Sequence, residues 1–402
     1  MKILLLNQTF HPDVAATAQY LSRVAVALVG RGHEVTVITS RRGYDQREAS
    51  FAARETWRGV KIIRVGATAL GKTAKWKRVI DFATFFMACT VRTFFLPRAD
   101  VVVALTSPPL ISFLGAAVSR FRGSRFIYWI MDLNPDAAIV AGWLEEKSWT
   151  AKILQNVSEW SLRRADRIIV LDGFVRDRIV GKGIPADKIV VIPPWSQNGS
   201  VQFDAAGRRK FRQENRIEDK FVVMYSGNHS PCHPLDTLLQ AARALANESR
   251  YFFMFVGGGS EQGKVEAFAR QHQLSNISCL PYRTERELAA SLSAADVQTV
   301  VMGNPFVGII HPCKIYNILA VGAPILYLGP PASHVTQILN GLPRGYAARS
   351  VQHGDVEGVV RSVRELGSIT PVREQGGAVT QNFAESVLLP RLVGVIEEVA
   401  GR

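Results

Sequence analysis

The sequence has little cysteine and no long uncharged apolar run. Its 402 residues include four cysteines, Cys89, Cys232, Cys279 and Cys313, none of which stands in a C-x-x-C pair. This distribution argues against a zinc site or a disulfide framework and favours a reducing compartment. The apolar stretch at residues 1–6 is too short for the core of a signal peptide. We therefore expect a cytoplasmic chain that opens with a buried strand.

Acidic residues are scarce relative to basic ones, and the imbalance is uneven. The chain has 48 Lys and Arg against 34 Asp and Glu, a net charge of +14. Residues 1–200 hold 28 basic and 16 acidic residues, whereas residues 201–402 hold 20 and 18. An excess in one half indicates an anionic partner, either nucleic acid, anionic lipid or a phosphorylated substrate, although solubility is the alternative. The sequence contains no recognised nucleic-acid-binding motif, so we expect no nucleic-acid partner.

Short apolar runs alternate with amphipathic helix patterns in both halves of the chain. The runs occupy residues 2–7, 34–39, 61–65, 101–105, 126–131, 167–171, 221–225, 251–256, 277–280, 297–301 and 324–328. This alternation predicts α/β domains with parallel sheets and right-handed crossovers. Residues 193–206 interrupt it with two prolines and a polar stretch, so we place the domain boundary there.

Three loops of the second half carry residues suited to an anionic ligand. Gly227-Asn228-His229 and Gly257-Gly258-Gly259 each follow an apolar run, and glycine lets the backbone approach a phosphate. The third segment, Gly308-Ile309-Ile310-His311-Pro312-Cys313-Lys314, leads into a helix whose first N–H groups can bind an anion together with Lys314. The alternative is that Lys314 is a surface lysine and His311 a packing residue in the loop.

Further candidates lie near the same loops. Asn317, one turn after Lys314, can hydrogen-bond a hydroxyl group, and His233 can contact phosphate when it is protonated. Tyr282 follows the run at residues 277–280 and is a further candidate for ligand contact. Each has a structural alternative, namely a helix-surface asparagine, a packed histidine or an ordinary loop tyrosine.

In the first half, two features are candidates for a functional role. Asp132 follows the run at residues 126–131 and can orient or deprotonate a hydroxyl group, whereas nearby Asp136 is placed to cap a helix. The second feature is the stretch 72–98, where a basic cluster precedes a phenylalanine-rich helix pattern that includes Asp81 and Arg92. These charges argue against a transmembrane span and favour an amphipathic helix at an anionic membrane, or a core helix with a polar stripe.

Taken in order, these segments resemble the GT-B glycosyltransferases of family four, of the bacterial polysaccharide, colanic-acid and O-antigen type. The resemblance covers nearly the whole chain, and it is carried by the order and spacing of residues 7–39, 128–135, 225–228, 255–259 and 312–324 taken together. It implies a GT-B fold, with two Rossmann-like doubly wound domains and a cleft between them. Residues 1–195 would then face the acceptor and the membrane, residues 200–380 would bind a nucleotide sugar, and residues 381–402 would form a helix packing back towards the first domain.

The resemblance implies a hexosyltransferase that moves a sugar from a UDP- or GDP-type donor to a lipid-linked or glycan acceptor, with retention of configuration and no cofactor. No D-x-D motif occurs in the sequence, so we expect no metal. We assign catalysis to Asp132, Lys314 and His311. Donor binding is assigned to Gly227, Asn228, His229, His233, Gly257, Gly258, Tyr282, Gly308, Ile309, Ile310 and Asn317. Membrane or acceptor contact is assigned to Lys72, Lys75, Lys77, Arg78, Phe85 and Phe86, and the expected location is the inner face of the bacterial inner membrane.

The sequence departs from the family pattern at chemically important positions. The two carboxylates of the E-x7-E motif fall on Ile309 and Asn317, and the Arg and Lys that follow the first glycine loop fall on Asn228 and His233. Two alternatives therefore stay open. One is a sugar-nucleotide epimerase of the same fold, and the other is a non-catalytic partner subunit that has lost its carboxylates.

Overall fold

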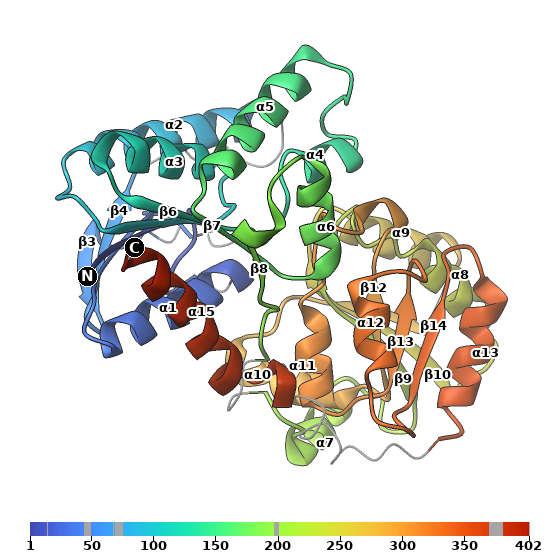
Figure 1. The fold of residues 1–402 in the computed structure, drawn as a ribbon. Helices are drawn as coiled ribbons and strands as arrows, with labels where there is room; N and C mark the ends of the chain where they lie inside the picture. Colours follow the sequence, from blue (N-terminus) through green and yellow to red (C-terminus); the bar gives the residue numbers. More distant parts are fainter. Residues whose placement is uncertain are drawn as a thin grey trace. The chain divides into compact units, whose positions relative to one another are not determined.

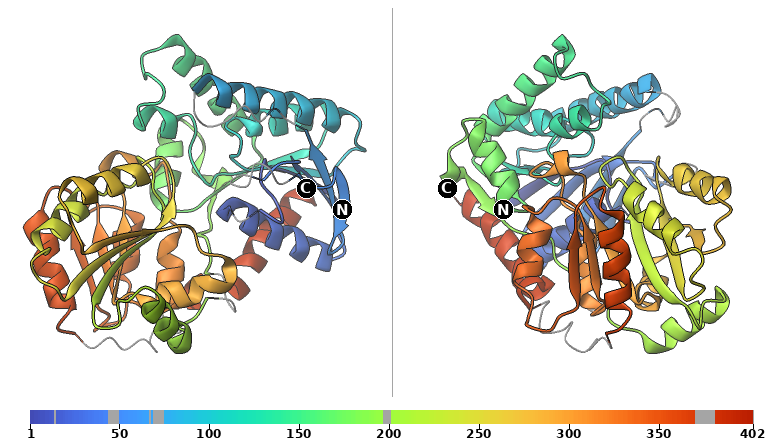
Figure 2. Two further views of the ribbon diagram at one scale, coloured as in Figure 1. Left: turned by 180° about the vertical axis from the view of Figure 1, so that it is seen from behind. Right: turned by 90° about the vertical axis from the view of Figure 1, so that its right-hand side faces the viewer.

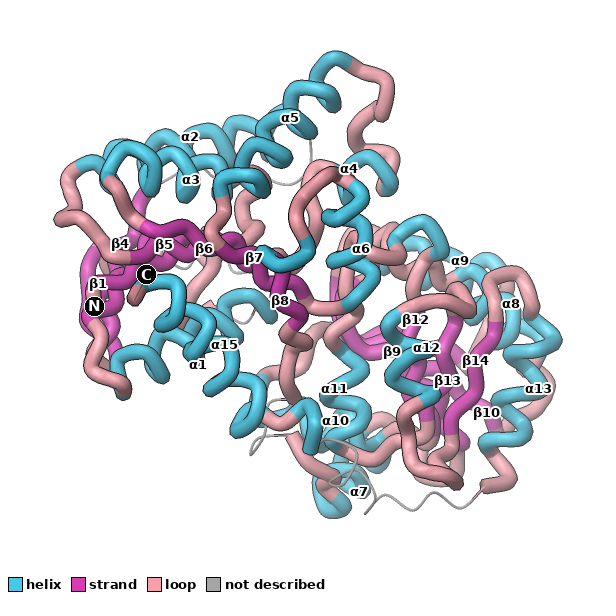
Figure 3. The backbone as a smooth tube through the Cα atoms, in the orientation of Figure 1, coloured by secondary structure: helices cyan, strands magenta, loops and turns pink. Residues whose placement is uncertain are grey.

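The computed structural model describes residues 1–13, 15–43, 50–66, 68, 75–196, 201–369 and 381–401. The chain divides into two units. The N-terminal unit comprises Met1–Pro193, Gly308–Ile310 and Leu388–Arg402, and the C-terminal unit comprises Pro194–Val307 and His311–Val387. Each unit is an α/β layer structure around a largely parallel sheet, which confirms the predicted fold class (Figure 3).

An eight-stranded sheet forms the centre of the N-terminal unit, and β3 alone among its strands pairs antiparallel. From edge to edge the strands are β3 (Arg54–Trp57), β4 (Val60–Val65), β2 (Glu34–Ser40), β1 (Lys2–Leu6), β5 (Val101–Ala104), β6 (Arg125–Trp129), β7 (Arg167–Val170) and β8 (Ile189–Val191). All four residues of β5 are buried because helices cover both faces of the sheet.

Helices α2, α3 and α5 lie on one face of this sheet, and α1 and α15 lie on the other (Figure 1). The helices of this unit are α1 (Ala16–Gly30), α2 (Lys75–Phe94), α3 (Ile111–Arg122), α4 (Asp136–Val140), α5 (Trp149–Arg164) and α6 (Gly173–Gly181), joined by most of α15 (Glu385–Ala400). Glu397 of α15 accepts a hydrogen bond from Arg31 at 2.5 Å and pairs with His33 at 2.8 Å, which holds α15 against the loop after α1. Among the described helices, none combines the length and apolar character needed to span a bilayer.

A six-stranded parallel sheet forms the centre of the C-terminal unit, with helices on both faces (Figure 2). Its strands, in spatial order, are β11 (Ile277–Leu280), β10 (Tyr251–Gly258), β9 (Phe221–Asn228), β12 (Val297–Val301), β13 (Ile325–Leu328) and β14 (Ala348–Val351). Its helices are α7 (Ala205–Glu214), α8 (Asp236–Ala244), α9 (Gln262–Gln271), α10 (Glu285–Ala294), α11 (Lys314–Ala320), α12 (His334–Asn340) and α13 (Val356–Leu366).

Alternation along β9 divides the apolar core of this unit into two layers. Val223 and Tyr225 pack with the residues of α8 and α13, whereas Val222 and Met224 pack with Phe211 of α7 and the end of α10. Successive side chains of a strand point to opposite faces, so the strand contributes to both layers. The side chain of Tyr225 is thereby fixed on the α8 side of the sheet.

Candidate functional site

The carboxyl ends of β9 and β10 form the backbone frame of the candidate site. Gly227 and Gly257 are paired in register there, with φ angles of 141° and 139°. A β-carbon on Gly257 would lie 2.0 Å from the carbonyl oxygen of Gly227, so the two strand ends approach too closely for a side chain. The next carbonyl, that of Gly258, accepts a hydrogen bond from the N–H of His229 at 2.7 Å. Two predicted loops are therefore one hydrogen-bonded structure.

Lys314 begins α11 and extends towards this frame. Its Nζ lies 3.4 Å from the ring centroid of Tyr225, and a β-carbon on Gly227 would lie 2.9 Å from the same nitrogen. Within the described part of the chain, the buried Nζ has no hydrogen-bond partner. Burial lowers the pKa of Lys314 well below its usual value. Lys314 is thus not a solvated surface lysine but a desolvated amine placed against a glycine loop.

Two histidines adjoin Lys314, and both are neutral near pH 7. Burial and the charge of Lys314 lower the pKa of His229 to about 4 and the pKa of His233 to about 3. The Nδ1 of His233 lies 2.7 Å from the carbonyl oxygen of Val301, whereas both ring nitrogens of His229 are buried without a partner among the described residues. The expectation that His233 supplies charge by protonation is therefore wrong for the free protein, because burial disfavours the imidazolium.

Other predicted donor-site residues surround the same frame. Tyr282 is half-exposed, and its hydroxyl donates to the carbonyl oxygen of Gly258 at 3.1 Å. Asn228 is exposed and ends β9. Asn317 is half-buried on α11, one turn after Lys314. The C-terminal unit therefore brings Tyr282, Asn228 and Lys314 to the ends of neighbouring strands, where parallel sheets bind ligands.

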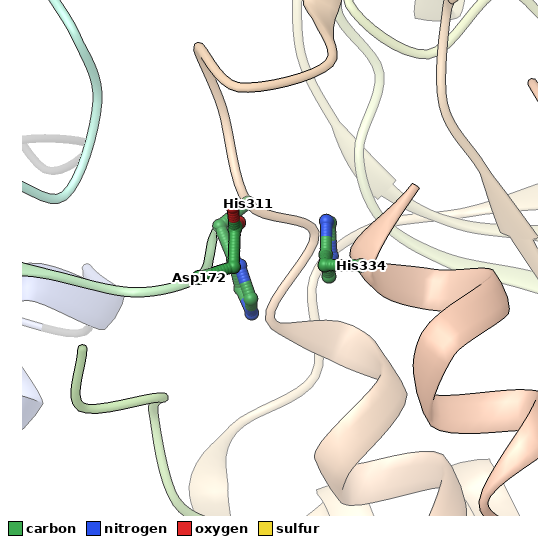
Figure 4. Close-up of side chains that lie close together, drawn as sticks. All are labelled: Asp172, His311 and His334. Atoms are coloured by element: carbon green, nitrogen blue, oxygen red, sulfur yellow. The ribbon is translucent and has the colours of Figure 1, made fainter. Parts of the chain in front are cut away.

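His311 has partners that favour a packing role. Its Nε2 lies 2.8 Å from the hydroxyl oxygen of Tyr316, and its ring stacks on that of His334 with centroids 3.8 Å apart (Figure 4). The ring of Tyr316 in turn contacts Phe383. The side chain of His311 is thus held by an aromatic cluster of the C-terminal unit, which is the structural alternative considered for it.

The tripeptide Gly308–Ile310 belongs to the N-terminal unit, although the sequence suggests a donor loop of the C-terminal domain. The carbonyl oxygen of Ile309 accepts from the N–H of Leu133 at 2.9 Å, and a β-carbon on Gly308 would lie 2.7 Å from the carbonyl oxygen of Phe174. The Ile309 side chain is fully buried. These contacts give Gly308 and Ile309 structural partners in the N-terminal unit.

The two aspartates after β6 have different environments. Asp136 begins α4, is buried, and lies 3.1 Å from both Arg178 and Lys182, so it is paired within the N-terminal unit. Asp132 is exposed at the carboxyl end of the sheet. Of the two carboxylates, Asp132 is therefore the more accessible to solvent.

Helix α2 has two apolar sides, one buried in the core and one exposed to solvent. Phe85, Cys89 and Thr93 are buried, so the assignment of Phe85 to membrane contact is wrong, because this stripe packs into the core. Phe86 is half-buried and its ring centroid lies 6.4 Å from that of Phe113. Of the basic residues, Lys77 is half-buried, Lys72 lies outside the described residues, and the side chains of Lys75 and Arg78 are likewise not described.

The opposite side of α2 and the helices α3 and α5 carry a set of exposed apolar side chains, of which the sequence analysis included only those of α2. We call it the α2–α3–α5 face. It comprises Met87, Val91 and Phe94 of α2, Phe113 and Phe121 of α3, and Trp149, Ile153 and Trp160 of α5. The rings of Phe113 and Trp160 lie 5.1 Å apart, which joins α3 to α5. Exposed Arg120, Lys152, Arg163 and Arg164 lie on the same helices. The helical spacing of Trp149, Ile153 and Trp160 was a signal that could have found it.

Comparison with known proteins shows which proteins this chain is similar to. Residues 16–195 match the family described as a glycosyl transferase 4-like domain. The chain is similar to the putative colanic acid biosynthesis glycosyl transferase WcaI of Escherichia coli, with 25% identity over 385 residues, 91% of this chain and 92% of that protein. The N-terminal half of the chain accordingly carries a glycosyl transferase 4-like domain, and nearly the whole chain is similar to a glycosyl transferase of polysaccharide synthesis.

Two solved structures share the fold. A sucrose-phosphate synthase from Thermosynechococcus elongatus superimposes with a TM-score of 0.74 at 15% identity, covering 99% of both chains. HepE from Anabaena, solved in complex with UDP-glucose, gives a TM-score of 0.74 at 14% identity, covering 99% of this chain and 100% of that one. The chain therefore has the GT-B fold.

Proposed function

We propose that this protein is a glycosyltransferase that takes a sugar from a nucleoside-diphosphate sugar of the UDP or GDP type and transfers it, with retention, in the synthesis of a cell-surface polysaccharide or glycolipid. One observation carries the proposal. The Nζ of Lys314 is buried without a hydrogen-bond partner among the described residues, against the glycine frame at the ends of β9 and β10. A buried amine of this kind needs an anion to stabilise its charge.

A donor diphosphate meets that need. Transfer breaks the bond between the sugar C1 and the diphosphate oxygen, forms a bond from C1 to the acceptor oxygen, and leaves extra negative charge on the diphosphate. A positive group already in place lowers the barrier, since its stabilisation grows as this charge develops. The structure of HepE with UDP-glucose supports a UDP-type donor. The similarity to WcaI supports a role in polysaccharide synthesis.

On the N-terminal unit, we assign the α2–α3–α5 face to an anionic membrane and to a lipid-linked acceptor. Phe94 and Trp149 are each 74% exposed, and Phe121 is 85% exposed. Aromatic rings flanked by arginine and lysine are suited to an anionic lipid surface, because the rings enter the interface and the cations meet headgroups. Asp132 is the carboxylate that we assign to orient the acceptor hydroxyl. The corresponding location is the cytoplasmic face of the inner membrane.

A non-catalytic partner subunit is the second candidate. It is favoured by Ile309 and Asn317, which stand where the family has carboxylates. Such a subunit would bind the donor without turning it over. Hydrolysis or transfer of the bound donor sugar in the presence of a membrane extract distinguishes the two, because only the enzyme releases the free nucleoside diphosphate.

Calorimetric titration of the full chain with UDP-, GDP-, ADP- and dTDP-sugars tests the proposed donor class. We expect one class to bind with 1:1 stoichiometry, and we expect its affinity to fall in Lys314→Met but not in the exposed control Lys210→Met. If none of the four classes binds the wild-type protein, the proposed function is wrong.

A further inference from the structure

The ring of Tyr225 is the partner of the Lys314 ammonium. The Nζ lies 3.4 Å from the ring centroid, which places it over the face of the ring, where the negative end of the quadrupole attracts a cation. Within the described residues no carboxylate forms an ion pair with this lysine, and its Nζ has no hydrogen bond. The contact holds the amine at the glycine frame, because a β-carbon on Gly227 would come within 2.9 Å of the nitrogen.

The ring of Tyr225 is held in place by burial, by a hydrogen bond and by a neighbouring ring. Tyr225 lies in β9, is fully buried, and is paired in register with Phe255 of β10. Its hydroxyl donates to the carbonyl oxygen of Asn228 at 2.6 Å, and its ring meets that of His229 edge to face at 5.0 Å. One side chain therefore orients both the lysine and the turn that follows Gly227.

This partner places no negative charge beside the lysine. Burial raises the pKa of Tyr225 well above its usual value, so the phenol stays uncharged. His229 and His233 are also neutral near pH 7, because burial and Lys314 lower their pKa values to about 4 and about 3. A carboxylate in place of the ring would form an ion pair and compete with an incoming anion. An aromatic face is a weaker partner, worth roughly 2- to 30-fold in an equilibrium constant.

We propose that Tyr225 is a positioning residue for the donor diphosphate, which acts by holding the Lys314 ammonium over its ring face at the glycine frame. The inference rests on the proposed function, since it takes the diphosphate of a nucleotide as the anion. The lysine does not have to leave the ring to reach the ligand, because its position on the ring is already beside Gly227. Loss of the ring's attraction should therefore weaken binding of the diphosphate.

The test compares rings of the same shape and different charge distribution at position 225. Binding of UDP and GDP to the full chain is measured by calorimetry for the wild type, for Tyr225→Phe, and for a variant with pentafluorophenylalanine at position 225. The fluorinated ring reverses the quadrupole while it keeps the packing. Each is also made in the Lys314→Met background, and the thermal unfolding midpoint of every variant is recorded as a folding control.

We expect Tyr225→Phe to bind within about threefold of the wild type, and the fluorinated ring to bind about 2- to 30-fold more weakly than phenylalanine. This difference should vanish in the Lys314→Met background, because Tyr225 acts through the lysine. Equal affinities for the two rings, or a difference that persists without Lys314, would overturn the inference and leave the donor assignment standing. Failure of both nucleotides to bind the wild type would overturn the inference together with the proposed function.

Discussion

Gly257 and Gly227 face one another at the ends of β10 and β9, so closely that a β-carbon on Gly257 would lie 2.0 Å from the carbonyl oxygen of Gly227. The approach sets the separation of the two loops that frame Lys314. The sequence motif Gly257-Gly258-Gly259 therefore has a steric explanation in the fold, independent of any ligand.

Gly257→Ala should both destabilise the protein and weaken donor binding. The new methyl group cannot coexist with the present backbone, and the φ of 139° disfavours a side chain. We expect a loss of about 2 kcal/mol or more in the free energy of unfolding, measured by urea denaturation. The matched control is Gly263→Ala in α9, where a β-carbon meets nothing within 4 Å. That substitution should be neutral or slightly stabilising, and equal effects at the two positions would contradict the steric argument.

Lys314→Met should reduce turnover by on the order of 10²–10³, the usual effect of losing one preorganised group at a developing charge. Lys314→Arg should restore only part of the activity, because a planar guanidinium does not replace a compact ammonium. Steady-state kinetics with the true donor provide the measurement. Lys210, 78% exposed on α7, supplies the control in the form Lys210→Met. Retention of more than about a third of kcat/KM by Lys314→Met would remove the lysine from the site.

Asp296 should make the stability of the protein dependent on pH. Burial raises the pKa of this carboxyl group, but Arg208, the N–H of Val222 and Arg212 outweigh it and hold the pKa below its usual value. Because the folded pKa is depressed, the stabilisation is present above the unfolded pKa of about 3.9 and is lost as the pH falls through the lower folded value.

Asp296→Asn should therefore cost about 3 kcal/mol at pH 7, since it leaves two arginines without their anion. The gap between variant and wild type should narrow below about pH 4, as the wild-type carboxyl becomes protonated. Urea denaturation across this range is the measurement, and the exposed Asp219→Asn is the control. A difference that stays constant down to about pH 2 would show that charge is not its cause.

The α2–α3–α5 face should bind anionic vesicles. Phe94→Ser combined with Trp149→Ser should lower partitioning to phosphatidylglycerol vesicles by about tenfold or more, because each ring loses its burial in the interface. Raised salt should weaken binding further through screening of the arginines and lysines. Co-sedimentation with vesicles measures both effects. The control, Val387→Ser, removes a 54% exposed apolar side chain that lies outside this face. Vesicle binding that responds equally to both changes would exclude the assigned surface.

Catalysis should need no divalent metal. The sequence has no D-x-D motif, and in the proposed function Lys314 supplies the cation for the diphosphate instead. Activity with the true donor should change by less than about twofold after dialysis against EDTA. Removal of a catalytic metal would lower the activity by far more. Loss of activity that Mn²⁺ or Mg²⁺ restores would show that a metal shares the role given to Lys314.

The local sequence pattern was sufficient to predict the α/β layer architecture and part of the candidate site. The strands at residues 277–280 and 297–301 have the predicted bounds, because short apolar runs between turn residues form buried parallel strands with few alternatives. The edge strands β3 and β14 were missed because all but one of their residues are half-buried or exposed, which leaves a weak apolar pattern. Glycines at strand ends and a lysine opening a helix also suggest an anion site without any knowledge of the fold, since their chemistry is local.

Tertiary structure alone decided how these residues are used. The periodicity of α2 shows a wide apolar face, but only packing assigns Phe85 to the core and Phe94 to solvent. The low pKa of His233 depends on burial and on Lys314, which is 81 positions away in the sequence. The contact between the ring of Tyr225 and the Nζ of Lys314 also joins two residues that are distant in the sequence. The sequence determined which chemical groups are present and which strands carry them. Packing determined their solvation and their neighbours, because desolvation and charge act through space between residues that are distant along the chain.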